Sequence, residues 1–378
     1  MRKSARLIFI VSCLVFILSC ATTTKIKVKV LKPAEIDIGN IKKIAVIDFG
    51  FEGEWHFWKG GKGVGKLLVN AVGKKLGLVK EKPVLLPPDP LTAYPGEKVT
   101  EKFIAKLEEN GTFTVLKREQ ILRILRKQNF SITDEISDSQ AVYIGNLLGV
   151  DAVIIGSGGY SVKDYSRSKK YTKKENDSEI KYKEYKLIRV VNVQMSYKLV
   201  GIPSGAIVVS RNNTVSNCSN NKKIFDTCED YSEDSKEDRA FKNLTEWRLI
   251  VDRLVDSVLT ITVNEIAPHY VMELRTIKSG KTTTMKAGMD YAKRGFWEDA
   301  KKSWEYILTD NSEEGKSDHM AALYNLGIYY EIKGDLGKAD SLFDKCFKLF
   351  GRSECLDCKL RIQKRKEELK KLSEQNNR

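Results

Sequence analysis

Two short motifs have the residue types and spacing of chemical sites. The first, Gly60–Lys66, has the G-x-x-x-x-G-K spacing of a loop whose backbone amides cradle phosphate groups. Leu67 stands where a serine or threonine would bind magnesium, so a turn at the start of a helix is the better interpretation. The second, Cys355–Cys358, has the C-x-x-C spacing of redox sites, but it follows a helical region and not a βαβ unit. We therefore expect a structural disulfide there.

The other titratable side chains form no recognisable catalytic or metal-binding pattern. His56, His269 and His319 are isolated in the sequence, without a spacing that would gather zinc ligands. The acidic run at 229–238 lacks the pattern of a calcium-binding loop, and no Ser-His-Asp signature stands out. The sequence therefore predicts a protein that is not an enzyme and that needs neither a metal nor a dissociable cofactor.

The first twenty residues have the pattern of an export signal. Three basic residues precede an apolar run at 7–18, which is too short for a membrane-spanning helix of ~20 residues. The sequence Ile17-Leu18-Ser19-Cys20 resembles the bacterial lipobox, in which the cysteine is acylated and becomes the new N-terminus after cleavage. We therefore expect Cys20 to carry the lipid. Because Ala21 follows it, the resemblance implies sorting to the outer membrane, with the chain facing the periplasm.

Export changes how the charge and the cysteines are interpreted. Removal of residues 1–19, which carry three basic residues and no acid, lowers the formal charge from +15 to +12. A periplasmic chain meets no chromosome, so we exclude nucleic acid as a partner and ascribe the charge to a lysine-rich surface. The periplasm permits disulfides, and we expect Cys218 to pair with Cys228. The pairing among Cys346, Cys355 and Cys358 stays open, with one thiol left over.

Hydrophobic patterning predicts an α/β domain in the first two thirds of the chain. Short apolar runs indicate buried strands, strict alternation indicates a half-buried hairpin, and apolar positions at helical spacing indicate amphipathic helices. We expect strands at 25–31, 44–49, 113–116 and 151–157, a β-hairpin at 191–210, and helices at 100–109, 118–128, 139–148 and 244–266.

This order of elements resembles the CsgG family, the periplasmic fold of the curli-secretion lipoprotein. The matching features are Phe113 and Val115 before Arg118, the segment 141–151 with its Leu-Leu-Gly-Val-Asp ending, and Gly156 at the close of a strand. The resemblance covers residues 40–268 and implies a mixed sheet with packed helices. The same α/β arrangement occurs in lipoproteins that activate peptidoglycan synthases, so it implies a fold without deciding the role.

One departure from the curli channel concerns residues 161–186. A channel of that kind inserts two hairpins per subunit, and their strands need an uncharged face toward lipid. Residues 191–199 have such a face, whereas lysines and acids occupy both alternation phases of 161–186. We therefore predict no pore and expect a solvated hairpin or a mobile loop. Contact of this segment with anionic lipid headgroups or with the acidic run is the alternative.

The last third of the chain contains a repeat with a separation of 39 residues. The recurring positions are Ala287, Gly288, Tyr291, Gly295, Ala300 and Trp304, which correspond to Leu326, Gly327, Tyr330, Gly334, Ala339 and Phe343. This pattern of small and large residues resembles the tetratricopeptide repeat (TPR), whose period is ~34 residues. Two repeats rarely bury enough apolar surface to be stable alone, so the charged helix at 360–372 is expected to cap them. The resemblance implies a concave partner-binding face that includes Tyr291, Asn325 and Tyr329.

The expected organisation is an α/β domain followed by an all-α module of TPR helical hairpins. The expected segments are the cleaved signal at 1–19, a lipid-anchored linker at 20–40, the CsgG-like domain at 41–272, two TPR-like repeats at 281–350, and a capping helix with tail at 352–378. We expect an outer-membrane scaffold that binds envelope or secreted proteins through the TPR-like module, and homo-oligomerisation stays open. The alternatives are a subunit of a CsgG-type secretion channel and a regulator of a peptidoglycan synthase.

Overall fold

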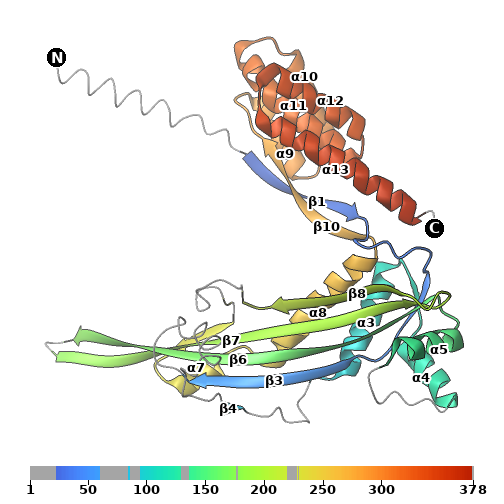
Figure 1. The fold of residues 1–378 in the computed structure, drawn as a ribbon. Coiled ribbons are helices and arrows are strands. Elements are labelled where there is room, and N and C mark those ends of the chain that lie inside the picture. Colours follow the sequence, from blue (N-terminus) through green and yellow to red (C-terminus); the bar gives the residue numbers. More distant parts are fainter. Residues whose placement is uncertain are drawn as a thin grey trace, which may run out of the picture. The chain divides into compact units, whose positions relative to one another are not determined.

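The computed structural model describes residues 23–59, 84–85, 94–128, 136–175, 178–218, 228 and 230–376. They form two units, one from 34–267 and one that combines the residues up to 33 with 268–378. The first unit is a mixed α/β structure, and the second is helical apart from a two-stranded ribbon (Figure 1). The expected fold class, a mixed sheet with packed helices followed by a helical region, is confirmed at this level.

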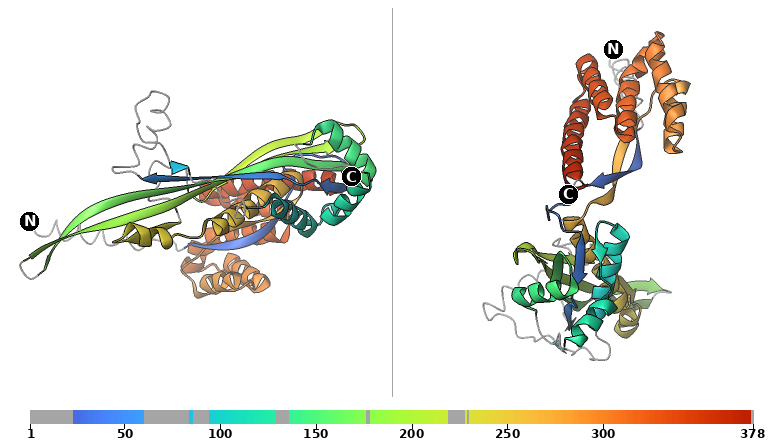
Figure 2. Two further views of the ribbon diagram at one scale, coloured as in Figure 1. Left: turned by 90° about the horizontal axis from the view of Figure 1, so that it is seen from below. Right: turned by 90° about the vertical axis from the view of Figure 1, so that its right-hand side faces the viewer.

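The α/β unit is built around a sheet with two long central strands. β6 (Ala152–Glu175) and β7 (Ser178–Gly201) pair antiparallel along their whole length and run side by side in Figure 2. On the other side of β6, two strands pair parallel to it one after the other, β2 (Lys43–Val46) and then β3 (Gly50–Lys59). The remaining strands are β4 (Val84–Leu85) beside β3, β5 (Thr114–Val115) beside β2, and β8 (Ile207–Ser216) and β9 (Tyr231–Asp234) beside β7.

Helices cover both faces of this sheet, but only in part. Because successive residues of a strand point to opposite faces, Ile44 belongs to one core and Ala45 to the other. The larger core lies under α3 (Gly96–Asn110) and α8 (Trp247–Ile266), and the smaller lies under α4 (Arg118–Lys127) and α5 (Asp138–Leu148). A short helix, α7 (Glu237–Lys242), precedes α8 and packs near Leu187.

The four longer helices of the α/β unit, α3, α4, α5 and α8, lie where the sequence predicts them, whereas α7 is not predicted. The Ser137 side chain accepts a hydrogen bond from the Gln140 backbone N–H and so begins α5. Gly149, with a φ of 60°, ends that helix in the left-handed conformation that glycine adopts readily. The hairpin predicted at 191–210 is also confirmed, with Leu199 of β7 opposite Val209 of β8. Within the described segments, no helix combines the length and the apolar character needed to cross a membrane.

The helical unit contains the repeat. Its helices are α9 (Thr283–Lys293), α10 (Trp297–Thr309), α11 (Glu313–Lys333), α12 (Leu336–Phe350) and α13 (Ser353–Asn376). A Cβ atom on Gly288 would lie 2.6 Å from Nε1 of Trp304, and one on Gly327 would lie 2.5 Å from Cε1 of Phe343. The recurring small and large residues are therefore contacts that let the two helices of each pair approach closely.

The ribbon of the helical unit joins two segments that are far apart in the sequence. β1 (Thr23–Lys32) pairs antiparallel with β10 (His269–Lys278), from Thr23 opposite Lys278 to Lys32 opposite His269. A strand at 25–31 is expected from the alternation of charged and apolar residues, but β10 is not, and 20–40 is expected to be a linker. Periodicity within one segment does not reveal a partner that lies at the other end of the chain.

Candidate interaction surfaces

Several predicted sites lie outside the described residues. These are Cys20 with the signal at 1–19, the Gly60–Lys66 motif and the side chain of His56. In the described segments, no group of three or more His, Cys, Asp or Glu side chains is arranged to hold a metal ion. His319 instead has its Nε2 3.0 Å from the carbonyl oxygen of Asp310.

The predicted partner face of the helical unit is largely internal. Asn325 is fully buried, and its side-chain amide both donates to the carbonyl of Lys278 and accepts from the N–H of Lys278, each at 2.8 Å. Tyr329 is 6% exposed, and its hydroxyl donates to the carboxylate of Glu298 at 2.8 Å. Asn325 and Tyr329 are therefore corrected from partner-binding to structural residues, because the chain itself occupies their polar groups. Tyr291, at 42% exposure, is the predicted residue that lies on a surface.

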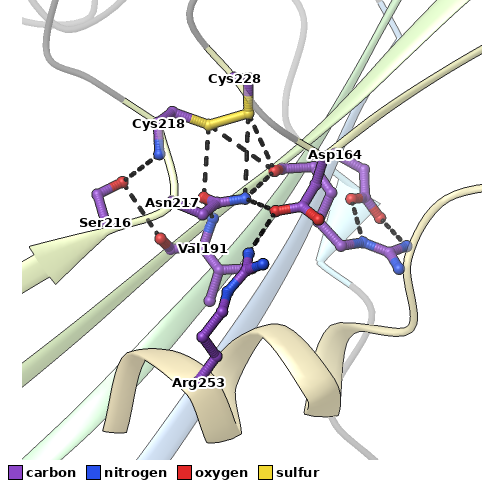
Figure 3. The surroundings of a disulfide bond; sticks show 9 residues. Asp164, Val191, Ser216, Asn217, Cys218, Cys228 and Arg253 are labelled. Carbon is purple, nitrogen blue, oxygen red and sulfur yellow. Dashed lines mark hydrogen bonds and ion pairs between the residues drawn. A yellow bond between two sulfur atoms is a disulfide. The ribbon is translucent and has the colours of Figure 1, made fainter. Parts of the chain in front are cut away.

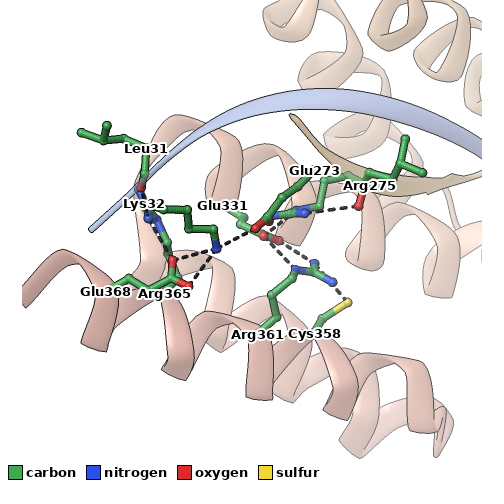
Figure 4. Close-up of polar contacts among 10 residues, drawn as sticks. Leu31, Lys32, Glu273, Arg275, Glu331, Cys358, Arg361, Arg365 and Glu368 are labelled. Atoms are coloured by element: carbon green, nitrogen blue, oxygen red, sulfur yellow. Dashed lines mark hydrogen bonds and ion pairs between the residues drawn. The ribbon is translucent and has the colours of Figure 1, made fainter. Parts of the chain in front are cut away.

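A chain of alternating charges attaches the ribbon to the helices (Figure 4). The carboxylate of Glu331 on α11 accepts from Nε of Arg275 on β10 at 2.7 Å. The same carboxylate accepts from Nε and Nη2 of Arg361 on α13, at 2.8 and 2.6 Å. Arg275 also donates to Glu273 at 2.6 Å. Glu331 thus lies between two guanidinium groups from two different elements.

The same chain of charges continues to β1. Nζ of Lys32 lies 2.6 Å from Oε1 of Glu273 and 2.8 Å from Oε1 of Glu368, and Arg365 donates to the carbonyl of Leu31 at 2.6 Å. Burial opposes the ionisation of Glu273, but the hydrogen bonds from Lys32 and Arg275 outweigh it and hold its pKa below the usual value. The ribbon is therefore an integral part of the helical unit.

The helical unit also contains one disulfide and one buried thiol. Cys346 on α12 is joined to Cys355 on α13, which ties the last two helices together. Cys358 is free and buried, and its Sγ lies 3.5 Å from the hydroxyl of Tyr324. Burial raises the pKa of the Cys358 thiol, which disfavours the reactive thiolate. The C-x-x-C motif therefore does not close on itself in this structure.

The second disulfide, between Cys218 and Cys228, lies at the end of β8 (Figure 3). Beside it, the buried Asn217 donates to Asp230 at 2.6 Å and to the carbonyl of Arg189 at 2.8 Å. Arg253 on α8 completes the cluster with an ion pair to Asp230 at 3.0 Å. The disulfide and these contacts join β8, β7 and α8.

The described acids of the run at 229–238 have separate partners. Besides Asp230, Glu233 pairs with Lys186 at 3.0 Å and Asp234 pairs with Arg239 at 2.8 Å. The lysine-rich segment 161–186 thus belongs to a long hairpin, and it contacts the acidic run at Lys186. These carboxylates are used for individual ion pairs and do not converge on one point.

The face of the sheet that carries α4 and α5 continues past these helices as a polar surface. Because the strands pair in register, its side chains form three cross-strand rows over β3, β6, β7 and β8. We call these residues the open sheet face: Gly50, Ser157, Ser196 and Asn212; Glu52, Gly159, Gln194 and Thr214; Glu54, Ser161, Asn192 and Ser216. Ser157, Gln194 and Asn212 are exposed members of it. The polar phase of the alternation at 191–199 is the sequence signal for this surface.

A cavity of about 890 Å³ lies where the open sheet face meets the helix-covered part. Its polar lining includes Asp48, Glu52, Ser157, Ser196, Lys198 and Arg211. Arg118 binds the carboxylate of Asp48 through two hydrogen bonds of 2.7 Å, and Lys198 pairs with Asp138 at 2.9 Å. The cavity therefore presents hydroxyl groups between charges of both signs.

Three solved structures illustrate what the chain is similar to. The C-terminal domain of LpoB from Salmonella enterica is 14% identical with a TM-score of 0.26, over 48% of this chain and 87% of that one. The PelC dodecamer from Paraburkholderia phytofirmans is 13% identical with a TM-score of 0.23, over 66% of this chain and 100% of that one. Lipoprotein GNA1162 from Neisseria meningitidis is 12% identical with a TM-score of 0.22, over 57% of this chain and 99% of that one.

Two family models match parts of the chain, while comparison with curated proteins gives no match. A model described as "Domain of unknown function (DUF6340)" matches residues 286–373, the region of α9 to α13. The tetratricopeptide resemblance of these helices stays a prediction. A model described as "Curli production assembly/transport component CsgG" matches residues 90–224, which include α3 to α5 and β5 to β8. The expected resemblance is confirmed there, and the α/β unit contains a CsgG-like domain.

Proposed function

We propose that this chain is a bacterial lipoprotein that acts as a non-enzymatic scaffold in envelope assembly or secretion. It is held in the outer membrane by an acylated Cys20 and faces the periplasm. The export pattern at 1–20 and the CsgG-like match at 90–224 support an envelope protein. Each buried methylene of an acyl chain contributes ~0.8 kcal/mol, so several chains hold a protein on a membrane persistently.

The observation that carries the scaffold role is the open sheet face together with the cavity beside it. Serine, asparagine, glutamine and threonine side chains cover this surface in register, and Glu52 and Arg211 place opposite charges at the cavity. A protein partner satisfies such a surface with its own donors and acceptors, and the opposite charges select its orientation. The partner is therefore an envelope or secreted protein that binds the α/β unit.

The helical unit has a supporting role in this proposal. Its helix pairs are TPR-like, with Gly288 against Trp304 and Gly327 against Phe343 as equivalent contacts. The side of α11 that carries Asn325 is covered by β10, so a partner of this unit contacts other surfaces, such as the one around Tyr291.

The test compares what co-purifies with the full chain and with two arginine variants after cross-linking in intact cells. Ser157→Arg and Ser196→Arg obstruct the cavity, whereas Thr260→Arg adds the same charge on an exposed position of α8 and serves as the control. We expect a defined set of envelope proteins with the wild type and the control, reduced at least about tenfold in both cavity variants. An identical set in all four proteins would contradict the proposal.

The CsgG-like match also favours a second candidate, a subunit of an oligomeric secretion channel. Light scattering of the detergent-extracted full chain separates the two candidates. A monomer or small oligomer excludes the channel, whereas a large ring favours it. The narrower role of a peptidoglycan-synthase regulator is tested by synthase activity in vitro, with and without the chain.

A further inference from the structure

The β1–β10 ribbon has two faces of different character. Alternate residues of β10 point toward the helices, and of these Arg275 and Ile277 are buried. The other residues of β10, which alternate with these, point away from the helices. Three of them are large, apolar and exposed: Tyr270 at 62%, Met272 at 59% and Leu274 at 55%. A protein in water rarely leaves such side chains adjacent to one another unless the surface is used.

A row of lysines lies beside this apolar row. In the register of the ribbon, Lys27 is opposite Leu274, Lys29 is opposite Met272, and Lys25 is opposite Thr276. All three lysines are exposed, and Nζ of Lys29 lies 4.1 Å from the centre of the Tyr270 ring. Four successive cross-strand pairs of this outer face include no acid: Lys25 with Thr276, Lys27 with Leu274, Lys29 with Met272, and Leu31 with Tyr270.

We infer that the outer face of the ribbon rests on an anionic lipid surface. Lysine ammonium groups pair with lipid phosphates, while the tyrosine, methionine and leucine side chains enter the boundary between headgroups and acyl chains. The charge attraction acts only close to the surface, within about one Debye length of ~10 Å. Apolar contact and charge therefore act together only if the ribbon lies flat on the membrane.

The length of the chain before the ribbon favours this occupant. This step rests on the proposed function, because it takes Cys20 as the acylated residue. β1 begins at Thr23, three residues after Cys20, and an extended chain spans at most ~3.5 Å per residue. The acyl anchor thus holds the start of the ribbon within about 10 Å of the lipid. A bilayer is the surface that this face meets first.

The helices hold the outer face in position for such contact. Asn325 and Glu331 bind the inner side of β10, and Glu368 binds Lys32 of β1. Because these bonds fix the ribbon, its outer side chains cannot turn inward to hide their apolar surface. The face is therefore preorganised, which lowers the entropy lost on binding.

The test uses the mature chain without Cys20, residues 21–378, so that membrane binding does not depend on the acyl group. Flotation is measured with vesicles of phosphatidylglycerol and phosphatidylcholine, and with phosphatidylcholine alone. We expect binding to the anionic vesicles that weakens as salt is added. The triple variant Lys25→Gln, Lys27→Gln, Lys29→Gln should weaken it about a hundredfold, and Met272→Ser with Leu274→Ser at least about tenfold.

The control removes the same charge elsewhere in the helical unit, in the triple variant Lys302→Gln, Lys338→Gln, Lys348→Gln on α10 and α12. Equal losses in the control and the ribbon variants would show a non-specific charge effect and overturn the inference. So would absence of binding, or a dimer whose formation requires the ribbon residues. The mass of Cys20-containing peptides from cells tests acylation separately, so the failure of the anchor and the failure of the ribbon are distinguishable.

Discussion

Asn325 on α11 forms two hydrogen bonds of 2.8 Å with the backbone of a single residue, Lys278 at the end of β10. The side chain is fully buried and uses both its donor and its acceptor. The resemblance of the repeat to the tetratricopeptide pattern predicts that this asparagine contacts a partner. Here it holds a strand of its own chain, so the helical unit includes its ribbon and the partner surface must be sought elsewhere.

Replacement of Asn325 tests this structural role. Asn325→Ala leaves the N–H and carbonyl of Lys278 without their partner, so we expect a loss of about 2–4 kcal/mol in the free energy of unfolding. Urea unfolding of the full chain measures it, and hydrogen exchange at 269–278 localises it. Tyr291→Ala, at an exposed position, is the control and should cost less than about 1 kcal/mol. Equal effects of the two substitutions would show that Asn325 does not hold β10.

The close approach of α11 and α12 gives a second prediction. Gly327→Ala places a methyl group against Phe343, and we expect a destabilisation of about 1–3 kcal/mol. Gly337→Ala is the matched control, because its Cβ would have nothing closer than 3.8 Å, and we expect it to stabilise α12 by up to about 1 kcal/mol. In a double-mutant cycle, Phe343→Leu should recover part of the stability lost in Gly327→Ala. Strictly additive effects of the two substitutions would argue against a contact between Gly327 and Phe343.

Acid should loosen the ribbon through Glu273. In the folded chain, the pKa of Glu273 lies below its usual value of 4.5. The ion pairs of Glu273 with Lys32 and Arg275 therefore stabilise the fold fully above pH 4.5, and this stabilisation is lost as the pH falls through the folded-state pKa. Hydrogen exchange at 269–278 should therefore become faster as the pH is lowered from about 5 to about 3, after correction for the intrinsic rate. Glu273→Gln should show weaker protection at neutral pH and a flatter pH dependence. A variant with the slope of the wild type would refute the assignment.

The cysteines provide a fourth prediction. In residues 21–378, Cys358 is buried with a raised pKa, and the other four cysteines are in disulfides. A thiol reagent should therefore label the folded chain very slowly and should label one thiol after unfolding without reductant. Rapid labelling, or a second thiol, would contradict the pairing of Cys346 with Cys355.

The sequence predicts the parts of the fold that repeat over short distances. Alternation at 191–199 identifies the hairpin, and the recurrence of Gly288 and Gly327 identifies the helix packing. The pairing of β1 with β10 is not predictable in this way, because nothing in either segment specifies a partner so far along the chain. The charged segment 161–186 is ambiguous for a related reason: at 167–170 and 179–183, beyond the neighbouring strands, successive side chains on both faces of the hairpin are exposed, so alternation disappears.

Only part of the candidate site can be predicted from the sequence. The polar phase of β7 is visible in the sequence, but the three rows of the open sheet face depend on the register of four strands. In the same way, Asn325 and Tyr329 lie at positions of the repeat where a surface is expected, and only the placement of β10 and Glu298 shows that they are internal.

Site-specific photo-cross-linking in intact cells shows whether the open sheet face holds an envelope protein. A photoreactive residue is placed at Gln194 or Asn212 on that face, or at the exposed Tyr306 on α10 as the control, and the adducts are identified by mass spectrometry. This binding role predicts the same envelope protein from Gln194 and Asn212, an adduct that is lost when Ser196→Arg is added, and no such adduct from Tyr306. Adducts from Tyr306 alone, or none from either sheet position, would contradict it.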